Sequence, residues 1–343
     1  MKYLIFRTDR IGDFLITTSL IHSIKKNDKN ALVYIVSSIK NNQFISDYNF
    51  VDKIFLLKKN NILYKLKLFF QLRKYNFDTI VVSDKKNRSI LLTLFLKSKK
   101  KVFNVSKYIQ KKLLNLLYDN VFLDNDNQID TPIKKILSNN CNALNIILND
   151  ESFHYLKENQ FLDNSSSINV IPSDIDDYVL FHYDEKWEID NYIKAFKKAS
   201  SLTDIKTGSK LFIKFLLKLS NKTSKTIIIT TGTIETKLIA ELKSSSVKLN
   251  NFIYEIQLNG AKAYLILDQN FFSISHIISK CKLFIACHGA FTHIAANYKI
   301  KILDVIESDK QIHYGRFTYE FKNYKRLFRE NFNDLSNKII NCL

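Results

Sequence analysis

The first residues that could do chemistry are Gly12 and Asp13, close to the start of the chain. They lie between a short apolar run, residues 3–7, and a segment whose apolar residues recur at helical spacing. This pattern predicts a strand, a loop and a helix. A glycine there lets the backbone approach a ligand closely, and the neighbouring carboxylate can act as a general base. The alternative is that Asp13 only caps the helix.

A second candidate site lies at residues 288–293, where a helix is predicted to follow a buried strand. The first backbone N–H groups of such a helix, together with the positive end of its dipole, favour a diphosphate. His288 and His293 add two imidazole groups to this turn. The alternative for His293 is a hydrogen-bonded core histidine, because its helix is rich in isoleucine and alanine.

Both candidate sites need strands that end beside helices, and the chain alternates strands and helices twice. In the first half, strands are predicted at 3–7, 31–37, 52–57, 78–83 and 101–105, and helices from Phe14 onward and at 60–74 and 88–96. In the second half, strands are predicted at 178–182, 226–230, 283–286 and 301–306, and helices within 189–220 and at 234–243, 272–280 and 290–296. The alternation predicts an α/β fold of two Rossmann-like, doubly wound sheets with a ligand cleft between them.

Composition favours a globular protein of about two domains. Of the 343 residues 46% are hydrophobic, and the low counts of glycine (6) and proline (2) argue against a turn-rich β-sandwich. The four cysteines lack metal-ligand spacing, and neither a signal peptide nor an apolar run of about 20 residues is evident. No GxGxxG pattern occurs in the first loop, which disfavours a dehydrogenase. We therefore expect a cytoplasmic protein with buried thiols.

The positive charge is concentrated in one segment. The formal net charge is +19, and residues 51–112 hold 17 basic residues against Asp52, Asp78 and Asp84, which is a net +14. Such a field favours a polyanion, namely anionic lipid, a phosphorylated glycan or nucleic acid. The alternative is a solvated lysine-rich surface. Because 60–74 is predicted to be an ordinary amphipathic helix, most of its apolar residues are expected to face the core: Leu63, Phe69, Phe70 and Leu72.

Four segments carry recognisable motifs. Residues 2–20 contain an apolar strand, an R-x-D-x-x-G-D turn and an apolar helix, and residues 182–187 place a lysine before a tryptophan. Residues 231–235 contain a glycine followed by a glutamate, and residues 283–296 contain a strand, a glycine turn with two histidines, and a helix. In this order the segments resemble glycosyltransferase family 9, the ADP-heptose:lipopolysaccharide heptosyltransferases.

The resemblance implies a GT-B fold with two Rossmann-like domains and a cleft between them. It implies an acceptor-side domain over residues 1–165, a nucleotide-sugar-binding domain over 166–316, and a helical segment, 317–343, that packs back on the first domain. The implied activity is an inverting, metal-independent transfer of a heptose or related sugar from a nucleoside diphosphate to lipopolysaccharide or another surface glycan. No cofactor is implied, because the nucleotide sugar is a substrate.

The resemblance also implies roles for individual residues. Asp13 is the implied base, with Arg10 and Gly12 in the acceptor-side loop. The implied donor diphosphate and sugar site comprises Lys186, His288, Gly289, Ala290, Phe291, Thr292 and His293. Gly232 and Glu235 are implied at the nucleoside. Structural alternatives are a solvated Lys186, a Trp187 that is simply core, a Glu235 that complements its own helix, and a Gly232 that only relieves a turn.

The donor turn departs from the family pattern. When His293 is aligned with the family histidine, His288 takes the place of an aspartate, Gly289 that of a serine or threonine, and Ala290 that of a glycine. Phe291 replaces the following proline. Because the family aspartate lies close to the donor sugar, the resemblance indicates a divergent member and leaves the sugar and nucleotide open.

The expected partners are a nucleotide-sugar donor, a glycolipid or glycan acceptor, and an anionic membrane surface. The basic residues 51–112 would attach the protein peripherally to the inner face of the inner membrane. No nucleic-acid partner is expected. Three alternatives stay open: an epimerase or other nucleotide-sugar enzyme of the same fold, an inactive relative, and a basic nucleic-acid-binding protein with aromatic residues among the lysines of 65–75.

Overall fold

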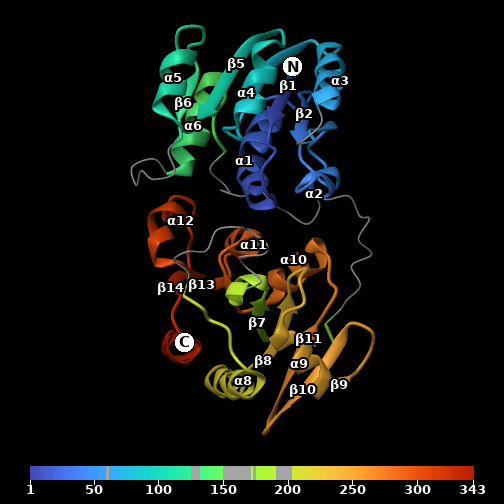
Figure 1. Cartoon of the computed structure of the whole chain (residues 1–343), viewed down its shortest axis with the longest axis vertical. Coiled ribbons are helices and arrows are strands. Elements are labelled where there is room, and N and C mark those ends of the chain that lie inside the picture. The colour runs from blue at the N-terminus through green and yellow to red at the C-terminus, as the bar shows by residue number, and fades with distance from the viewer. Residues whose placement is uncertain (59–61, 125–131, 150–170, 173–174, 191–202) are drawn as a thin grey trace. The chain divides into compact units, whose positions relative to one another are not determined.

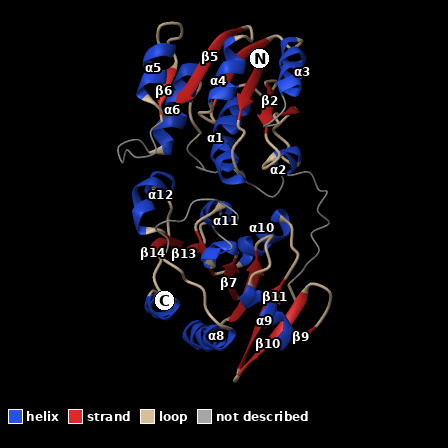
Figure 2. Cartoon of the chain, viewed as in Figure 1, coloured by secondary structure: helices blue, strands red, loops and turns tan. Residues whose placement is uncertain are grey.

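Two α/β units make up the computed structural model of the chain (Figure 1). The structure describes residues 1–58, 62–124, 132–149, 171–172, 175–190 and 203–343. The first unit comprises Met1–Asn164 with Gly315–Glu320, and the second comprises Ser165–Tyr314 with Phe321–Leu343. In each unit the strands, red in Figure 2, alternate with helices. The predicted doubly wound α/β fold is confirmed, while the predicted boundary at 165–166 lies outside the described residues.

The first unit is built on a parallel sheet in the order β3-β2-β1-β4-β5-β6. Its strands are β1 (Lys2–Phe6), β2 (Leu32–Ser37), β3 (Lys53–Leu56), β4 (Phe77–Val82), β5 (Ser98–Val105) and β6 (Val121–Leu123). Its helices are α1 (Ile11–Asn27), α2 (Asn42–Ser46), α3 (Ile62–Arg73), α4 (Asn87–Leu94), α5 (Tyr108–Leu114) and α6 (Ile133–Leu144). The strand order reverses between β1 and β4, and ligands of doubly wound sheets bind at such a reversal.

The helices of the first unit cover the two faces of its sheet. Right-handed crossovers place α1 on one face and the helices after β3, β4 and β5 on the other. Leu68 and Leu72 of α3, Ile90 of α4 and Leu114 of α5 belong to one core cluster with alternate residues of the strands. Helix α6 contacts α1 and so belongs with the opposite face.

The second unit has the sheet order β14-β13-β12-β7-β8-β11-β10-β9. Its strands are β7 (Tyr178–Tyr183), β8 (Thr226–Thr231), β9 (Val247–Lys248), β10 (Ile253–Leu258), β11 (Ala261–Ile266), β12 (Leu283–Cys287), β13 (Lys301–Ile306) and β14 (Tyr324–Phe328). Its helices are α8 (Ser209–Thr223), α9 (Lys237–Ser245), α10 (Phe271–Lys280), α11 (Ala290–Asn297), α12 (Gln311–Thr318, shared with the first unit) and α13 (Phe332–Asn341). The order reverses between β7 and β12.

The second sheet carries an antiparallel extension that the sequence pattern did not predict. Strand β10 pairs antiparallel with β11 and with β9, whereas the other pairs of this sheet are parallel. The β10–β11 turn contains Gly260 at φ +82°, a left-handed conformation that glycine adopts without a steric penalty. Asn259-Gly260 is a hairpin signal of the sequence that the strand and helix alternation obscured.

The predicted packing of residues 317–343 on the first domain is wrong for most of this segment. Only Gly315–Glu320 belongs to the first unit. Strand β14 pairs parallel with β13, and Phe332, Leu335 and Ile339 of α13 are buried in the core of the second unit with residues of α8. The physical reason is that β13 has an open edge, and β14 followed by α13 completes the doubly wound pattern there.

The packing of α13 predicts the effect of a cavity. Leu335→Ala should destabilise the second unit by about 2–5 kcal/mol, because the leucine is fully buried in the core. Asn337→Ala, on the exposed side of the same helix, is the control and should change stability by less than about 0.5 kcal/mol. Denaturant unfolding of the whole chain measures both. Equal midpoints for the two variants would contradict this placement of α13.

Candidate functional site

Polar side chains gather at the point where each sheet reverses its strand order. In the first unit this point joins the carboxyl ends of β1 and β4, and in the second it joins those of β7 and β12. Each predicted catalytic or diphosphate-binding segment follows one of these four strands. The two sites are described separately, each within its own unit.

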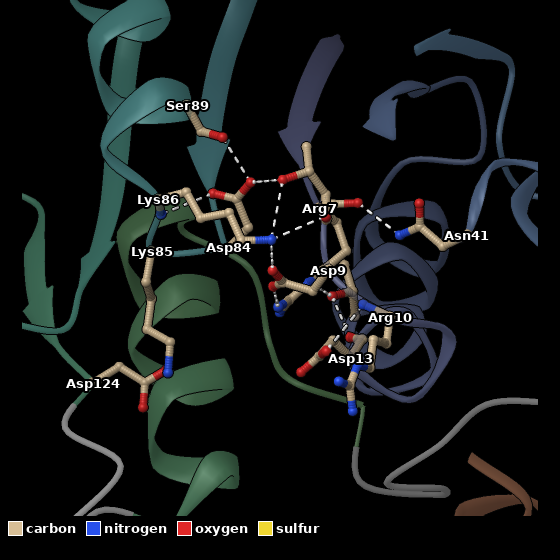
Figure 3. Close-up of polar contacts among 12 residues, drawn as sticks. Arg7, Asp9, Arg10, Asp13, Asn41, Asp84, Lys85, Lys86, Ser89 and Asp124 are labelled. Carbon is tan, nitrogen blue, oxygen red and sulfur yellow. Dashed lines mark hydrogen bonds and ion pairs between the residues drawn. The ribbon is translucent and has the colours of Figure 1, made fainter. Parts of the chain in front are cut away.

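Asp13 lies in the first turn of α1, at the end of the loop that follows β1 (Figure 3). Its Oδ2 atom accepts a hydrogen bond from the backbone N–H of Arg10, 3.2 Å away, so the carboxylate caps the helix. The Oδ1 atom has no hydrogen-bond partner among the described residues. Burial raises the pKa of Asp13, with Asp9 adding to the rise and Arg7 opposing it. Capping by one oxygen therefore leaves the other available to a substrate.

Arg10 and Gly12 border Asp13 in different ways. Arg10 is the exposed N-cap residue of α1, and Gly12 lies inside the helix rather than in the predicted loop, because α1 already begins at Ile11. Arg7 is buried and joins the loop after β1 to helix α1, since its Nε donates to the hydroxyl of Thr17 at 2.7 Å. Its Nη1 also pairs with Asp9 at 3.1 Å. The turn that presents Asp13 is thus anchored by a buried guanidinium.

A second carboxylate, Asp84, follows β4 and faces the same loop (Figure 3). Its Oδ2 accepts hydrogen bonds from the hydroxyls of Thr8 at 2.5 Å and Ser89 at 2.6 Å. Burial raises the pKa of Asp84, and nearby Asp9 raises it further. The Lys86 amino group pairs with Asp9 and donates to the backbone oxygen of Thr8 at 3.0 Å. These contacts tie the loop after β1 to the loop after β4.

Lys186 is the central group of the second site. It lies in a 3₁₀ turn, Glu185–Trp187, directly after β7. Its Nζ pairs with Asp184 at 2.8 Å and donates to the backbone oxygens of Cys287 at 3.2 Å and His288 at 2.9 Å. Burial is the largest single influence and lowers the pKa of Lys186, but Asp184, Cys287 and Glu185 together raise it to about 12. The structure therefore places a permanent positive charge beside the carboxyl end of β12, and not on a solvated surface.

Trp187 is a core residue that holds Lys186 in place. The indole is fully buried, stacks on Tyr183 and donates its Nε1–H to the backbone oxygen of His182 at 2.9 Å. Glycines on two sides permit the close packing of this turn. A Cβ atom at Gly289 would lie 2.7 Å from the Lys186 Nζ, and one at Gly232 would lie 2.9 Å from the Asp184 Cβ. Gly232 thus packs against the lysine turn, as its structural alternative allowed.

His288 is joined to a buried carboxylate that the sequence reasoning missed. Its Nδ1 lies 2.6 Å from Oδ2 of Asp304, a fully buried residue of β13. Tyr324 of β14 donates to the same oxygen at 2.7 Å, and Thr292 donates to Oδ1 at 3.1 Å. Because a carboxylate accepts, the Nδ1 of His288 carries the hydrogen in this pair. The carboxylate beside His288 is thus supplied by the adjacent strand, β13.

The remaining predicted residues of the second site have mixed placements. Ala290, Phe291 and Thr292 form the first turn of α11, where Thr292 accepts from the N–H of Gly289 at 3.2 Å. His293 is buried in the same helix, with its ring centroid 5.4 Å from that of His288. Glu235 is exposed, and its Oε1 atom lies 4.0 Å from the Lys243 Nζ. Helix α9 begins at Lys237 with Thr236 as its cap, so Glu235 also lies outside the first turn.

The missed residues share one property, which is that they follow or lie on strands far away in sequence. Asp84 and Lys86 come after β4, and Asp304 and Tyr324 lie on β13 and β14. The available signal was an aspartate in or directly after an apolar strand, since a buried carboxylate needs hydrogen-bond partners. Sequence spacing alone does not pair such residues with Asp13 or His288.

The Asp304 contacts predict an asymmetry between two substitutions at position 288. His288→Asp should destabilise the protein by about 3–5 kcal/mol, because it places a second carboxylate against a buried one. His288→Asn retains an N–H donor for Asp304 and should cost about 1 kcal/mol. Denaturant unfolding at neutral pH compares them. If the aspartate variant proves as stable as the asparagine variant, His288 does not serve Asp304 as its donor.

Comparisons with known proteins give no sequence match, because no family model and no curated protein matches the chain. Solved structures do match over the whole chain. Escherichia coli heptosyltransferase WaaC with ADP-2-deoxy-2-fluoro heptose has a TM-score of 0.66 and 13% identity, over 100% of this chain and 98% of its own. The glycosyl transferase family 9 structure from Veillonella parvula has a TM-score of 0.66 and 10% identity, over 98% and 90%. UDP-GlcNAc 2-epimerase from Methanocaldococcus jannaschii has a TM-score of 0.52 and 13% identity, over 99% and 92%.

These likenesses concern the fold, because identities of 10–13% carry no residue-level assignment. The WaaC structure and the family 9 structure have higher TM-scores against the chain than the epimerase has. The chain has the two-domain fold of the family 9 glycosyltransferases.

Proposed function

We propose that this protein is an inverting glycosyltransferase of the family 9 type that transfers a heptose or related sugar from a nucleoside diphosphate. The observation that carries the proposal is the Lys186 ammonium group held at the carboxyl end of β12, next to the start of α11. This arrangement occurs in a chain with the fold of WaaC, whose structures contain ADP and an ADP-heptose analogue. The acceptor in this proposal is lipopolysaccharide or another glycolipid. The net positive charge of residues 51–112 supports an acceptor that lies in anionic surroundings.

The second unit supplies the donor site in this proposal. The first N–H groups of α11 lack intrahelical acceptors and present the positive end of the helix dipole. Lys186 adds a full positive charge beside them, and the Asp184 ion pair keeps it charged. These groups would stabilise the negative charge that grows on the nucleoside diphosphate as it leaves. The transfer would need no divalent cation, because the lysine and the backbone dipoles supply the positive charge that stabilises the leaving group.

The first unit supplies the base. Asp13, with its raised pKa and its Oδ1 atom available, would take the proton of an acceptor hydroxyl as that oxygen attacks the anomeric carbon. The diphosphate leaves from the opposite face of the sugar, so the anomeric configuration inverts. Asp84 cannot serve equally well, because the hydroxyls of Thr8 and Ser89 and the backbone N–H of Lys86 already occupy its oxygens.

Asp13→Asn separates the proposed base from the helix cap. The asparagine keeps a side-chain oxygen for the N–H of Arg10, so folding and donor binding should be retained while transfer falls by about 10² to 10⁴. In the wild type the rate should rise with pH as Asp13 loses its proton, above the range of an ordinary carboxyl, and this rise should be absent from the variant. Sugar-transfer assays across pH measure both. Turnover equal to the wild type would remove Asp13 from the mechanism.

Lys186→Gln tests the charge at the donor site. The glutamine retains N–H donors but no charge, so affinity for nucleoside diphosphates should fall by about 10- to 100-fold, the scale of one charge-assisted hydrogen bond. Lys214→Ala, on the exposed side of α8, is the matched control and should bind as the wild type does. Calorimetry against ADP, GDP, UDP and CDP, each with EDTA present, gives the affinities. Binding that disappears with the chelator, or that is unchanged in the Gln variant, would contradict the proposed donor site.

A further inference from the structure

The outer surface of α4 and α5 is apolar and exposed. Seven large side chains are between 57% and 77% exposed there. We call them the docking face; they are Leu91, Phe95, Tyr108, Ile109, Leu113, Leu116 and Leu117. An exposed apolar surface of this kind on a globular unit marks an interaction site.

The docking face is one continuous surface because α4 and α5 are neighbours. The side chain of Gln110 at the start of α5 donates to that of Asn87 at the start of α4, at 2.6 Å. Lys101 in β5 donates to the backbone oxygen of Leu94 at 3.1 Å, and its amino group lies over the ring of Tyr118. Helical spacing explains the direction of the apolar residues: Ile90 and Leu114 point into the core, while Leu91 with Phe95 and Ile109 with Leu113 repeat every four residues on the outside.

Helix α3, on the same side of the sheet, also exposes large apolar side chains. Its Ile62, Leu63, Leu66 and Phe70 are at least half exposed, and Leu68 and Leu72 join the same core cluster as α4 and α5. Most of Leu63, Phe69, Phe70 and Leu72 were expected to face the core: Leu72 is buried in it and Phe69 packs against it, whereas Leu63 and Phe70 are exposed. The sequence pattern did not show which residues would be buried, because apolar residues occur on all sides of α3. The sheet covers only one side of the helix, so the apolar residues on the other side stay exposed.

Charge selects the partner for this face. Exposed lysines border it, among them Lys97, Lys107 and Lys112. None of the three carboxylates of residues 51–112 pairs with these three lysines: Asp84 is buried, Asp52 pairs with Lys25 and Asp78 pairs with Lys99. A second copy of the same face would bring two strongly positive surfaces together, whereas an anionic lipid surface matches both the apolar residues and the lysines.

We propose that the docking face inserts its apolar side chains into the interface of an anionic membrane, with the surrounding lysines on the lipid headgroups. Among the described residues, no helix combines the length and apolarity needed to cross a bilayer. Attachment at the surface is what this face provides. The biological purpose of this attachment rests on the proposed function, in which the acceptor is a glycolipid. Membrane binding by the docking face does not itself depend on sugar transfer.

The experiment is sedimentation with vesicles of phosphatidylcholine mixed with phosphatidylglycerol, compared with phosphatidylcholine alone. The wild type should bind only the anionic vesicles, and rising salt should weaken binding as the Debye length shortens. The variant Phe95→Ser, Leu113→Ser, Leu116→Ser leaves every charge in place and should lower the partition coefficient by about ten-fold or more. The variant Lys97→Gln, Lys107→Gln, Lys112→Gln should lower it and reduce its salt dependence.

Ile147→Ser is the matched control. Ile147 is 88% exposed in the same unit but follows α6, which lies with α1, so its variant should bind vesicles as the wild type does. Equal binding by the triple serine variant and the wild type would overturn the docking face, as would a wild type that ignores anionic vesicles. Sedimentation without lipid that shows a dimer lost in the serine variant would assign the face to a second copy. Calorimetry with ADP on the same variants keeps a failure of the donor site distinct from a failure of the docking face.

Discussion

The right-handed crossover between successive parallel strands is the constraint on which both candidate sites depend. Every parallel strand ends at the same edge of its sheet, and each is followed by a loop that leads into a helix. Where the strand order reverses, at β1 and β4 and again at β7 and β12, two such loops diverge and leave their polar residues next to each other. The glycines at 232 and 289 then permit the close approach of the lysine turn.

Buried carboxylates give each site its rigidity. Asp84 accepts from two hydroxyls and a backbone N–H, and Asp304 accepts from a histidine, a tyrosine and a threonine. Removing any one donor leaves a buried negative charge undersatisfied, which costs more than the single hydrogen bond contributes. The loops after β4 and β12 therefore have little freedom, and Lys86 and His288 are held by the same contacts. In contrast, only one carboxylate oxygen of Asp13 accepts a hydrogen bond among the described residues, which leaves the other for the proton of a substrate.

Most of the fold could be predicted from the sequence, whereas the pairings within the sites could not. The strand at 301–306 and the helix start at Ala290 were predicted at the observed residues, because uninterrupted apolar runs and flanking polar residues are local signals. Helix α1 began before the predicted loop ended, and residues 321–343 joined the second sheet because an open strand edge was available there. The contacts of Asp84 with Thr8 and of Asp304 with His288 join residues that are 76 and 16 positions apart.

The sequence by itself determined the alternation of strands and helices, the positions of Asp13 and Lys186 after apolar strands, and the positive charge of residues 51–112. These properties are local or additive, so they can be read along the chain. Only the tertiary structure decided that Lys186 is partly buried and charged, that Glu235 is exposed beside Lys243, and that Leu91 of α4 and Ile109 and Leu113 of α5 face outward. The reason is that burial and pairing depend on which elements pack together, and a helix with apolar residues on all sides can bury only the side that its sheet covers.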